Sequence, residues 1–207
     1  MLNLLSSSIF WGFVTGTLSG IFGIGGSIIS TPALRLVMQT TAEIALGTPL
    51  PVIIPTAVTA GINFYKAGLI DKRLIIYALP FGIIGSMAGS FFTKYIDAKY
   101  LMIVTAFLLV SGLLGVGGGI ILIPGFHLLM GMPIKVAMGS SLIIIALMAI
   151  PGSIVHYLLG HIDMVIFLGL CIGVIPGSRL GAKMSVNIRS KLLKMTFGIF
   201  LVIIGII

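Results

Sequence analysis

Long apolar blocks alternate with short polar or charged loops along this chain, and most blocks are about 20 residues long, as a membrane-spanning helix requires. Within a block the apolar residues are continuous and do not alternate with polar ones, which favours helices over the strands of a membrane barrel. We therefore predict an all-α, polytopic transmembrane bundle of about seven spans plus two re-entrant half-helices. The expected spans cover approximately residues 4–21, 41–65, 74–92, 100–114, 134–158, 164–183 and from 192 onward.

A glycine-rich stretch interrupts the first block. Residues 19–34 read SGIFGIGGSIISTPAL, in which Gly20, Gly23, Gly25 and Gly26 fall within seven positions. Each glycine inside a helix costs about 1 kcal/mol relative to alanine, so we expect the helix to break here and to resume over Ser27–Val37. The new helix would present unpaired N–H groups and a positive dipole end at membrane depth, which is the outline of an anion site. The alternative is that the glycines only let helices pack closely.

The same pattern returns at residues 111–126 as SGLLGVGGGIILIPGF, and the offset of 92 positions holds without a gap far downstream. The pairs that it superposes include Ser19 with Ser111, Pro32 with Pro124, Gly47 with Gly139, Tyr65 with Tyr157, Gly68 with Gly160 and Asp71 with Asp163. We predict one transmembrane domain built by duplication, with repeat 1 at 4–99 and repeat 2 at 100–207. Helix 100–114 aligns with both a repeat start and a repeat end, so the two repeats would share it.

The basic residues predict an orientation. If each glycine-rich segment is re-entrant, one repeat makes three crossings and the second enters the membrane inverted. With the N-terminus in the cytoplasm, the outside would hold Arg35, Lys94 and Lys99, and the cytoplasmic side would hold Lys66, Lys72, Arg73, Lys135, Lys183, Arg189, Lys191 and Lys194. That excess fits the positive-inside rule for a multi-pass protein of the cell membrane. If the segments cross fully, the repeats become parallel instead, and the sequence leaves this open.

The candidate substrate site combines the two glycine tracts with hydroxyls from the next segment of each half. Backbone N–H groups at the breaks and nearby hydroxyls are the donors that a small anion needs near the midplane. The residues expected to bind the substrate are Gly25, Gly26, Ser27, Thr48, Gly117, Gly118, Gly119, Ser140 and Ser141. The hydroxyls of the later segments have an alternative role, which is to bond to the preceding turn of their own helix.

Three basic side chains are candidates for steering an anion: Arg35, its repeat partner His127, and Arg179. Snorkelling to the interface explains Arg35 without a ligand, and a topology anchor explains Arg179. His156 and His161 flank a short loop, but they lack the spacing and carboxylate support of a metal site. We expect neither a metal nor a cofactor.

Composition narrows the classes of function. Hydrophobic residues make up 58% of the 207 positions and charged residues 8%, which excludes a soluble globule. The net charge of +8 is concentrated at segment ends, which suits orientation in a membrane and not nucleic-acid binding. The single cysteine, Cys171, excludes a disulfide within the chain. The four acidic residues lie at segment ends, so neither a buried cation site nor a catalytic set stands out.

The paired motif Ser-Gly-x-x-Gly-x-Gly-Gly-x-x-x-x-x-Pro at 19–32 and 111–124, followed in each half by Gly-[Thr/Ser]-x-Leu and Gly-x-Ile-Asp, resembles the sulfite exporter TauE/SafE family of membrane permeases. The resemblance covers nearly the whole chain. It implies transport of sulfur-containing anions such as sulfite, organosulfonates or sulfoacetate across a cytoplasmic membrane. The chain departs from the family in its short length, in Ser27 opposite Gly119, and in Pro49 where serine is usual, as at Ser141. These last departures suggest an asymmetric site.

The leading hypothesis is therefore a transporter for small sulfur-containing anions, bound near the midplane by half-helix N-termini and hydroxyls and moved by alternating access. The implied partners are the anion and membrane lipid, with no nucleic acid, and a homodimer stays open. The second hypothesis is a non-transporting membrane scaffold or assembly protein in which glycines pack the helices. An intramembrane enzyme is a distant third. The anion, the direction of transport and the coupling ion are not defined by the sequence.

Overall fold

The computed structural model describes residues 2–92 and 119–206, and all of their regular secondary structure is helical. The elements are α1 (Leu2–Phe22), α2 (Ser27–Pro32), the π-helical turn η1 (Ala33–Val37), α3 (Ala42–Gly47), α4 (Pro49–Lys66), α5 (Lys72–Phe92), α7 (Gly119–Pro124), η2 (Gly125–Leu129), α8 (Ile134–Leu158), α9 (Met164–Asn187) and α10 (Ser190–Ile206). The four stretches in this part of the chain that are long and apolar enough to cross a membrane are Leu4–Phe22, Ala42–Lys66, Ile134–Leu158 and Met164–Asn187. The all-α class is confirmed, and the expected span 100–114 lies outside the described residues.

Local sequence signals set the helix ends. Thr41 and Asp163 precede α3 and α9, and their side-chain oxygens accept backbone N–H groups from the first turn. Gly68 and Gly160 follow α4 and α8 with φ of 69° and 73°, a left-handed conformation that glycine adopts without strain. These signals fix two short loops, 67–71 and 159–163.

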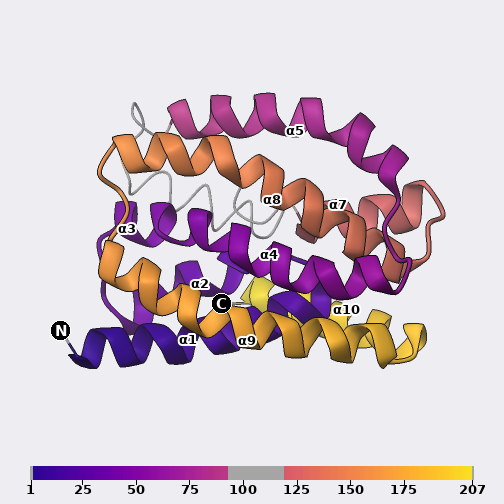
Figure 1. The fold of residues 1–207 in the computed structure, drawn as a ribbon, viewed down its shortest axis with the longest axis horizontal. Coiled ribbons are helices and arrows are strands. Elements are labelled where there is room, and N and C mark those ends of the chain that lie inside the picture. The colour runs from indigo at the N-terminus through magenta and orange to yellow at the C-terminus, as the bar shows by residue number, and fades with distance from the viewer. Residues whose placement is uncertain (1, 93–118, 207) are drawn as a thin grey trace.

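The long helices pack side by side in the order α1, α9, α4, α8, α5 (Figure 1). In Figure 1, α1, α9 and α4 run in one direction, whereas α8 and α5 run in the opposite direction. The 92-residue offset relates α4 to α8 and α5 to α9, so each described pair of equivalent long helices is antiparallel. The central contact of the bundle, between α4 and α8, joins a helix of one half to its counterpart in the other.

Glycines let α1 and α9 touch along their length. On each helix the glycines recur every fourth residue, so they form one stripe of small residues facing the partner helix. An added Cβ at any of these positions would collide with the backbone of the facing helix: Gly12, Gly16 and Gly20 on α1, and Gly173, Gly177 and Gly181 on α9. A part of the glycine content therefore serves helix packing, as the alternative interpretation of the sequence held.

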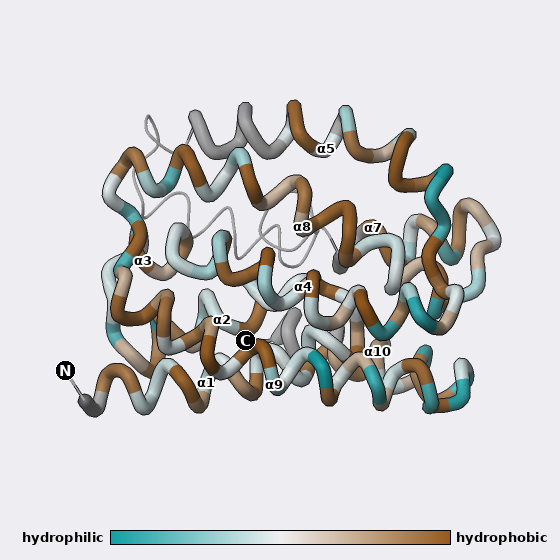
Figure 2. Tube along the Cα trace, viewed as in Figure 1, coloured by the Kyte–Doolittle hydropathy of each residue, from teal (hydrophilic) through white to brown (hydrophobic). Residues whose placement is uncertain are grey.

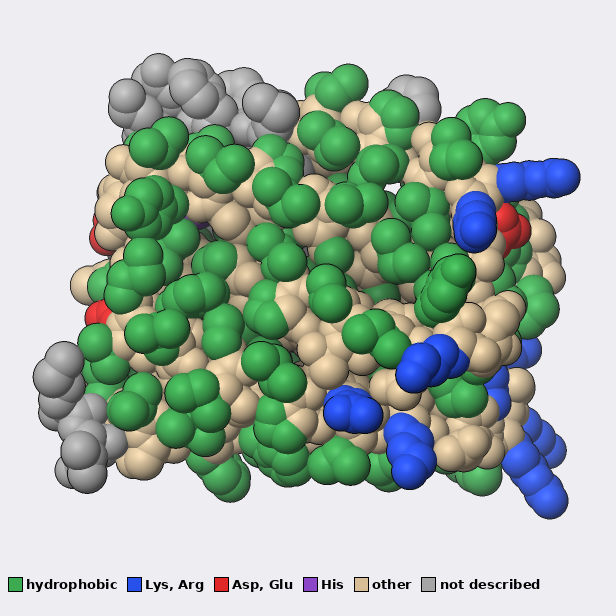
Figure 3. All heavy atoms as spheres, viewed as in Figure 1, with side chains coloured by type: hydrophobic (Ala, Val, Ile, Leu, Met, Phe, Trp, Pro, Cys, Tyr) green, Lys and Arg blue, Asp and Glu red, His purple; other side chains and the backbone are tan. Residues whose placement is uncertain are grey.

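The two ends of the bundle differ in charge. Lys and Arg side chains gather where α4 and α9 finish, which we call the basic end (Figure 3), and hydrophilic residues lie mostly near helix ends (Figure 2). We call the opposite end the far end. The helix α1 starts at the far end beside the start of α9, because Ser8 lies against Gly169. We expected the N-terminus and the basic residues of the α4–α5 loop on one side, and the structure instead places the start of α1 at the other end.

Candidate functional site

The first glycine tract breaks the helix at the predicted place. The helix α1 ends at Phe22 and α2 begins at Ser27, and between them Gly23, Gly25 and Gly26 have φ of 72°, 83° and 90°. Side chains are strained at such angles, so the break depends on glycine. From Ser27 the chain continues through α2 and η1, which matches the predicted half-helix.

Gly25 lies where the two halves meet. An added Cβ there would be 2.9 Å from Cγ2 of Ile145 and 3.5 Å from Cγ2 of Ile53. Ile53 on α4 and Ile145 on α8 are related by the 92-residue offset, and both are buried. Gly25 thus packs against Ile53 and Ile145, two equivalent side chains at the α4–α8 contact, and this apolar packing encloses the break in this conformation.

Four hydroxyl groups flank the break and have no hydrogen-bond partner in the described part of the chain. Thr15 and Ser19 lie one turn apart on α1, and Ser27 and Thr31 lie one turn apart on α2. Their exposed fractions are 1%, 0%, 2% and 4% in that order. A buried polar group without a partner costs about 1–3 kcal/mol, so four of them around one helix break need an explanation. We call these four residues the hydroxyl cluster.

The α1 side of the cluster faces the start of α2. The Cβ position of Gly26, the residue before α2, is 3.1 Å from Cγ2 of Thr15 and 3.7 Å from Oγ of Ser19. The first N–H groups of a helix have no intrahelical acceptor and carry its positive dipole end. Unpaired hydroxyls and the N-terminus of the α2–η1 half-helix are therefore next to each other.

Ser141 ties the break to the second half. Its hydroxyl lies 3.1 Å from the carbonyl oxygen of Gly23 and 2.9 Å from that of Met138 on its own helix, and it donates toward both. The Gly23 carbonyl follows the end of α1, where carbonyl groups lack intrahelical partners. Ser141 is thus next to the break, and its hydroxyl bonds to backbone carbonyl groups in this structure.

Thr48 and Ser140 connect the halves at opposite ends of the bundle. The Oγ1 of Thr48 accepts the backbone N–H of Asp163 at 3.1 Å, and the Oγ of Ser140 accepts that of Asp71 at 2.8 Å. The offset relates the two donors to each other and the two acceptors to each other. The oxygen of each hydroxyl is thus used in a contact between the two halves.

The glycines before these hydroxyls complete two equivalent contacts. A Cβ on Gly47 would collide with the carbonyl of His161, and a Cβ on Gly139 would collide with the carbonyl of Leu69. We call the first set, at Gly47–Thr48 and the loop 160–163, the far-end contact. The second set, at Gly139–Ser140 and the loop 68–71, is the basic-end contact. Each repeated Gly-hydroxyl motif thus docks on the Gly-x-x-Asp loop of the opposite half.

The steering candidates Arg35 and His127 close equivalent turns. Nη1 of Arg35 donates to the carbonyl of Thr40 at 2.6 Å, and Nδ1 of His127 lies 2.6 Å from the carbonyl oxygen of Met132. The offset relates Thr40 to Met132, so each side chain secures the turn that follows its own half-helix. The structure gives both residues a local contact away from the glycine break.

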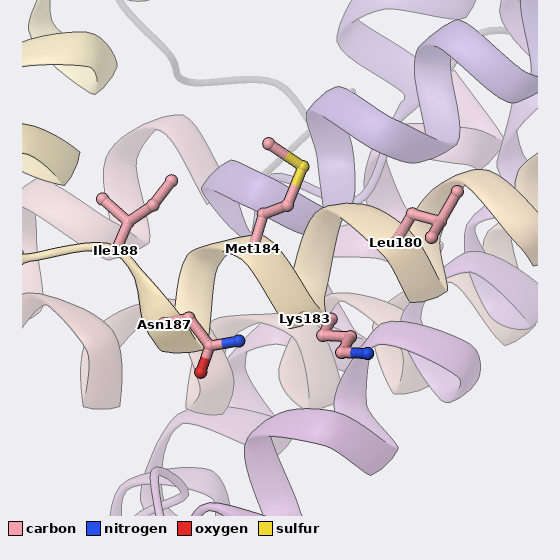
Figure 4. A pocket seen from close by; sticks show the side chains of 5 residues that line it. All are labelled: Leu180, Lys183, Met184, Asn187 and Ile188. Atoms are coloured by element: carbon pink, nitrogen blue, oxygen red, sulfur yellow. The ribbon is translucent and has the colours of Figure 1, made fainter.

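Arg179 is exposed on α9, and its backbone carbonyl accepts the side-chain amide of Asn63 at 3.3 Å. One turn further along α9 lies a surface pocket of about 360 Å³ (Figure 4). In Figure 4 the polar side chains of Lys183 and Asn187 extend to one side of the helix, and the apolar ones extend to the other. The residues that line the pocket are Leu180, Lys183, Met184, Asn187 and Ile188. This pocket shares no residue with the hydroxyl cluster.

The second glycine tract is described only from Gly119, where α7 begins; Gly117 and Gly118 lie outside the described residues. The helix α7 and the turn η2 together form the second half-helix, which ends at Leu129, close to the predicted end.

Sequence reasoning missed Thr15 and Thr31 as site residues and gave the hydroxyl of Ser19 no role. A signal was available, because hydroxyl residues recur four positions apart on both sides of the tract within otherwise apolar segments. Residues at that spacing share one face of a helix. Polar groups facing the interior of a membrane bundle are functional candidates by default.

Comparison with known proteins agrees with the repeated architecture. The family model described as Sulfite exporter TauE/SafE matches residues 8–111 and again residues 109–207. Two matches that adjoin near the second glycine tract indicate an internal repeat. No solved structure matches the chain.

Curated relatives resemble the chain over most of its length. It is 26% identical to the probable membrane transporter protein YunE of Bacillus subtilis over 255 residues, covering 94% of this chain and 93% of the relative. It is 27% identical to the probable membrane transporter protein MJ0441 of Methanocaldococcus jannaschii over 259 residues, covering 99% and 95%. Both alignments are longer than the 207 residues of this chain, so the relatives contain segments without a counterpart here.

Proposed function

The chain belongs to the sulfite exporter TauE/SafE family, and from that membership we propose that it is a permease for small sulfur-containing anions such as sulfite, an organosulfonate or sulfoacetate. The family is one of membrane transporters and not of enzymes. We place the substrate beside the first glycine break, in the interior of the bundle.

The hydroxyl cluster is the observation that carries this proposal. An oxyanion accepts hydrogen bonds from O–H and N–H donors, so it would give the four unpaired hydroxyls and the start of α2 the partners that they lack. The four side chains of the cluster are neutral, so the charge in each hydrogen bond would come from the anion alone. Binding without a full ion pair suits a transport site, which must release its ligand as well as bind it.

Movement between the halves would give the anion access. Ile53 and Ile145 close the space beside Gly25 in this conformation. If the far-end contact opens while the basic-end contact stays closed, the break would be exposed on the far side of the membrane. If the basic-end contact opens while the far-end contact stays closed, the break would be exposed on the other side. The antiparallel directions of α4 and α8 support inverted repeats at 4–99 and 100–207.

The charge distribution suggests which end faces the cytoplasm. Cytoplasmic loops carry an excess of Lys and Arg, so we assign the basic end to the cytoplasmic side of the cell membrane. The helix α1 starts at the far end and would therefore begin on the opposite side of the membrane. This orientation replaces the expectation of a cytoplasmic N-terminus. Cysteine labelling beside Lys72 and at Glu43 with an impermeant reagent in intact cells tests it.

Removal of the unpaired hydroxyls separates substrate binding from folding. The variants Thr15→Val and Thr31→Val keep the side-chain shape and delete a buried hydroxyl that has no partner, so thermal stability without substrate should stay constant or rise. If the cluster binds the anion, uptake of sulfite and of methanesulfonate into proteoliposomes should fall at least about tenfold, since a hydrogen bond to a charged group contributes about 1.5–3 kcal/mol.

Thr56→Val is the matched control. Thr56 is also buried, but its hydroxyl donates to the carbonyl of Val52 at 2.6 Å within α4, so we expect normal uptake. Wild-type uptake in both Thr15→Val and Thr31→Val would remove the site from the hydroxyl cluster. An absence of saturable uptake of every sulfur oxyanion by the unmodified protein would contradict the proposed function itself.

A non-transporting scaffold is the second candidate, and the glycine stripe between α1 and α9 favours it because those glycines serve close packing. Gly25→Ala does not discriminate between the candidates. At φ of 83° and beside Ile145, an alanine there would disturb folding under either function. The hydroxyl variants discriminate when they are compared with the unmodified protein. If the protein is a scaffold, the variants should be stable and the unmodified protein should not transport; if it is a permease, the unmodified protein should transport and the variants should not.

A further inference from the structure

The far-end contact contains two histidines at positions that are apolar in the basic-end contact. The Nδ1 atoms of His156 and His161 lie 3.3 Å apart, with His156 4% exposed and His161 half-buried. The 92-residue offset relates His156 to Phe64 and His161 to Leu69. An imidazole ring can bind a proton and the side chains of phenylalanine and leucine cannot, so of these four positions only the two at the far end have basic ring nitrogens.

The two rings are built into the contact between the halves. The backbone carbonyl of His156, at the end of α8, accepts the backbone N–H of His161 at 3.0 Å. The carbonyl and Cβ of His161 lie against Gly47, and two residues later the N–H of Asp163 donates to Thr48. A change in the distance between the two rings would therefore shift the loop 160–163 relative to the α3–α4 junction.

Few charged groups lie on the described elements around this pair. The Oδ1 of Asp163 is engaged at the start of α9, where it accepts two backbone N–H groups. Glu43 on α3 and Tyr157 on α8 are exposed, and Arg35 on η1 is bonded to the carbonyl of Thr40. The remaining ionisable residues of α4 and α9 are Tyr65, Lys66, Cys171, Arg179 and Lys183.

We propose that His156 and His161 together form a binding site for one proton, taken from the aqueous phase at the far end, and that this proton tightens the far-end contact. Two neutral imidazoles share one N–H···N hydrogen bond. One added proton, shared by the pair, makes this bond charge-assisted and roughly twice as strong. A second proton would make both rings cationic, and the two rings would then repel each other. When the pair loses its one proton, that proton returns to the water.

The basic-end contact, with Phe64 and Leu69 in these positions, has no such dependence on protons. In a permease, opening toward the far side would then depend on pH while opening toward the basic side would not. That consequence rests on the proposed function, whereas the proton site itself does not.

Hydrogen exchange at two equivalent amides tests the proton site in the full chain, in detergent and without substrate. The amides of Asp163 and Asp71 both follow an isoleucine, so the chemical pH dependence of their exchange nearly cancels in a ratio. Between about pH 8 and about pH 5.5, protection at Asp163 relative to Asp71 should rise about fivefold to tenfold, because the tie next to Asp163 becomes charge-assisted. A ratio that does not change with pH would overturn the proposal.

The equivalent residues of the other half supply the control variants. His156→Phe combined with His161→Leu gives the far-end contact the side chains of the basic-end contact, and its exchange ratio should be independent of pH. The single variant His161→Leu changes only a half-exposed loop residue, and its exchange ratio should also be independent of pH. It replaces the double variant if that variant does not fold. A pH dependence that persists in His161→Leu would overturn the proposal. Because no substrate is present, either result leaves the transport assay to be judged separately.

Discussion

The far-end contact and the basic-end contact share a backbone arrangement and differ in the side chains around it. In each contact a backbone carbonyl packs against a glycine, and a side-chain hydroxyl accepts a backbone N–H group. An aspartate caps the helix that follows. Beside this arrangement the far end has His156 and His161 where the basic end has Phe64 and Leu69. The comparison teaches that the repeated motifs encode how the halves dock, while neighbouring positions are free to acquire different chemistry.

The largest effect is expected at the glycines of the two contacts. In Gly47→Ala and Gly139→Ala the new Cβ would meet a backbone carbonyl that has no rotamer to adopt, so each variant should lose about 3 kcal/mol or more. Thermal unfolding of the purified protein in detergent measures this loss. Gly61→Ala is the control, since its Cβ would meet nothing within 4 Å, and it should gain up to about 1 kcal/mol. A normal unfolding temperature for Gly139→Ala would mean that the contact is absent.

The hydroxyls of the two contacts should have intermediate effects. Thr48→Val and Ser140→Ala each leave a backbone N–H without its acceptor, which costs about 1–3 kcal/mol. Hydrogen exchange locates the damage: Thr48→Val should expose the amide of Asp163 and not that of Asp71, and Ser140→Ala should do the reverse. The control is Ser153→Ala, which deletes a hydroxyl bonded only within α8. Equal exchange at both amides in Thr48→Val would show that the contacts are not independent.

Local features of this fold could be predicted from the sequence, because they depend on nearby residues. Glycine angles decide the break at Gly23–Gly26, and the bounds of α8 were predicted as Ile134–Leu158 and confirmed. The roles of Thr48 and Ser140 could not be predicted in the same way. Their partners lie 115 and 69 positions away, and only the docking of opposite halves brings them together.

The hydroxyl cluster shows a different reason for a missed prediction. Thr15 and Thr31 have no counterparts in the second half, where the offset places Phe107 and Ile123. A search guided by the duplication favours residues that occur twice, and it therefore passes over those that make one half different. The orphaned hydroxyls become visible only when burial and hydrogen bonding are known.

The smallest effect is expected at the carboxylates of the two loops. Asp71 and Asp163 each accept two backbone N–H groups at the start of a helix, at 2.9 and 3.3 Å and at 2.9 and 3.0 Å. Loss of such a cap costs about 1 kcal/mol, so Asp71→Ala and Asp163→Ala should each lower the unfolding temperature by about 2–4 °C. Asparagine caps helices about as well as aspartate, so Asp71→Asn and Asp163→Asn should restore most of the loss. If Asn restores stability in one loop and not in the other, the negative charge itself holds one of the loops, and the two contacts would then differ by more than their histidines.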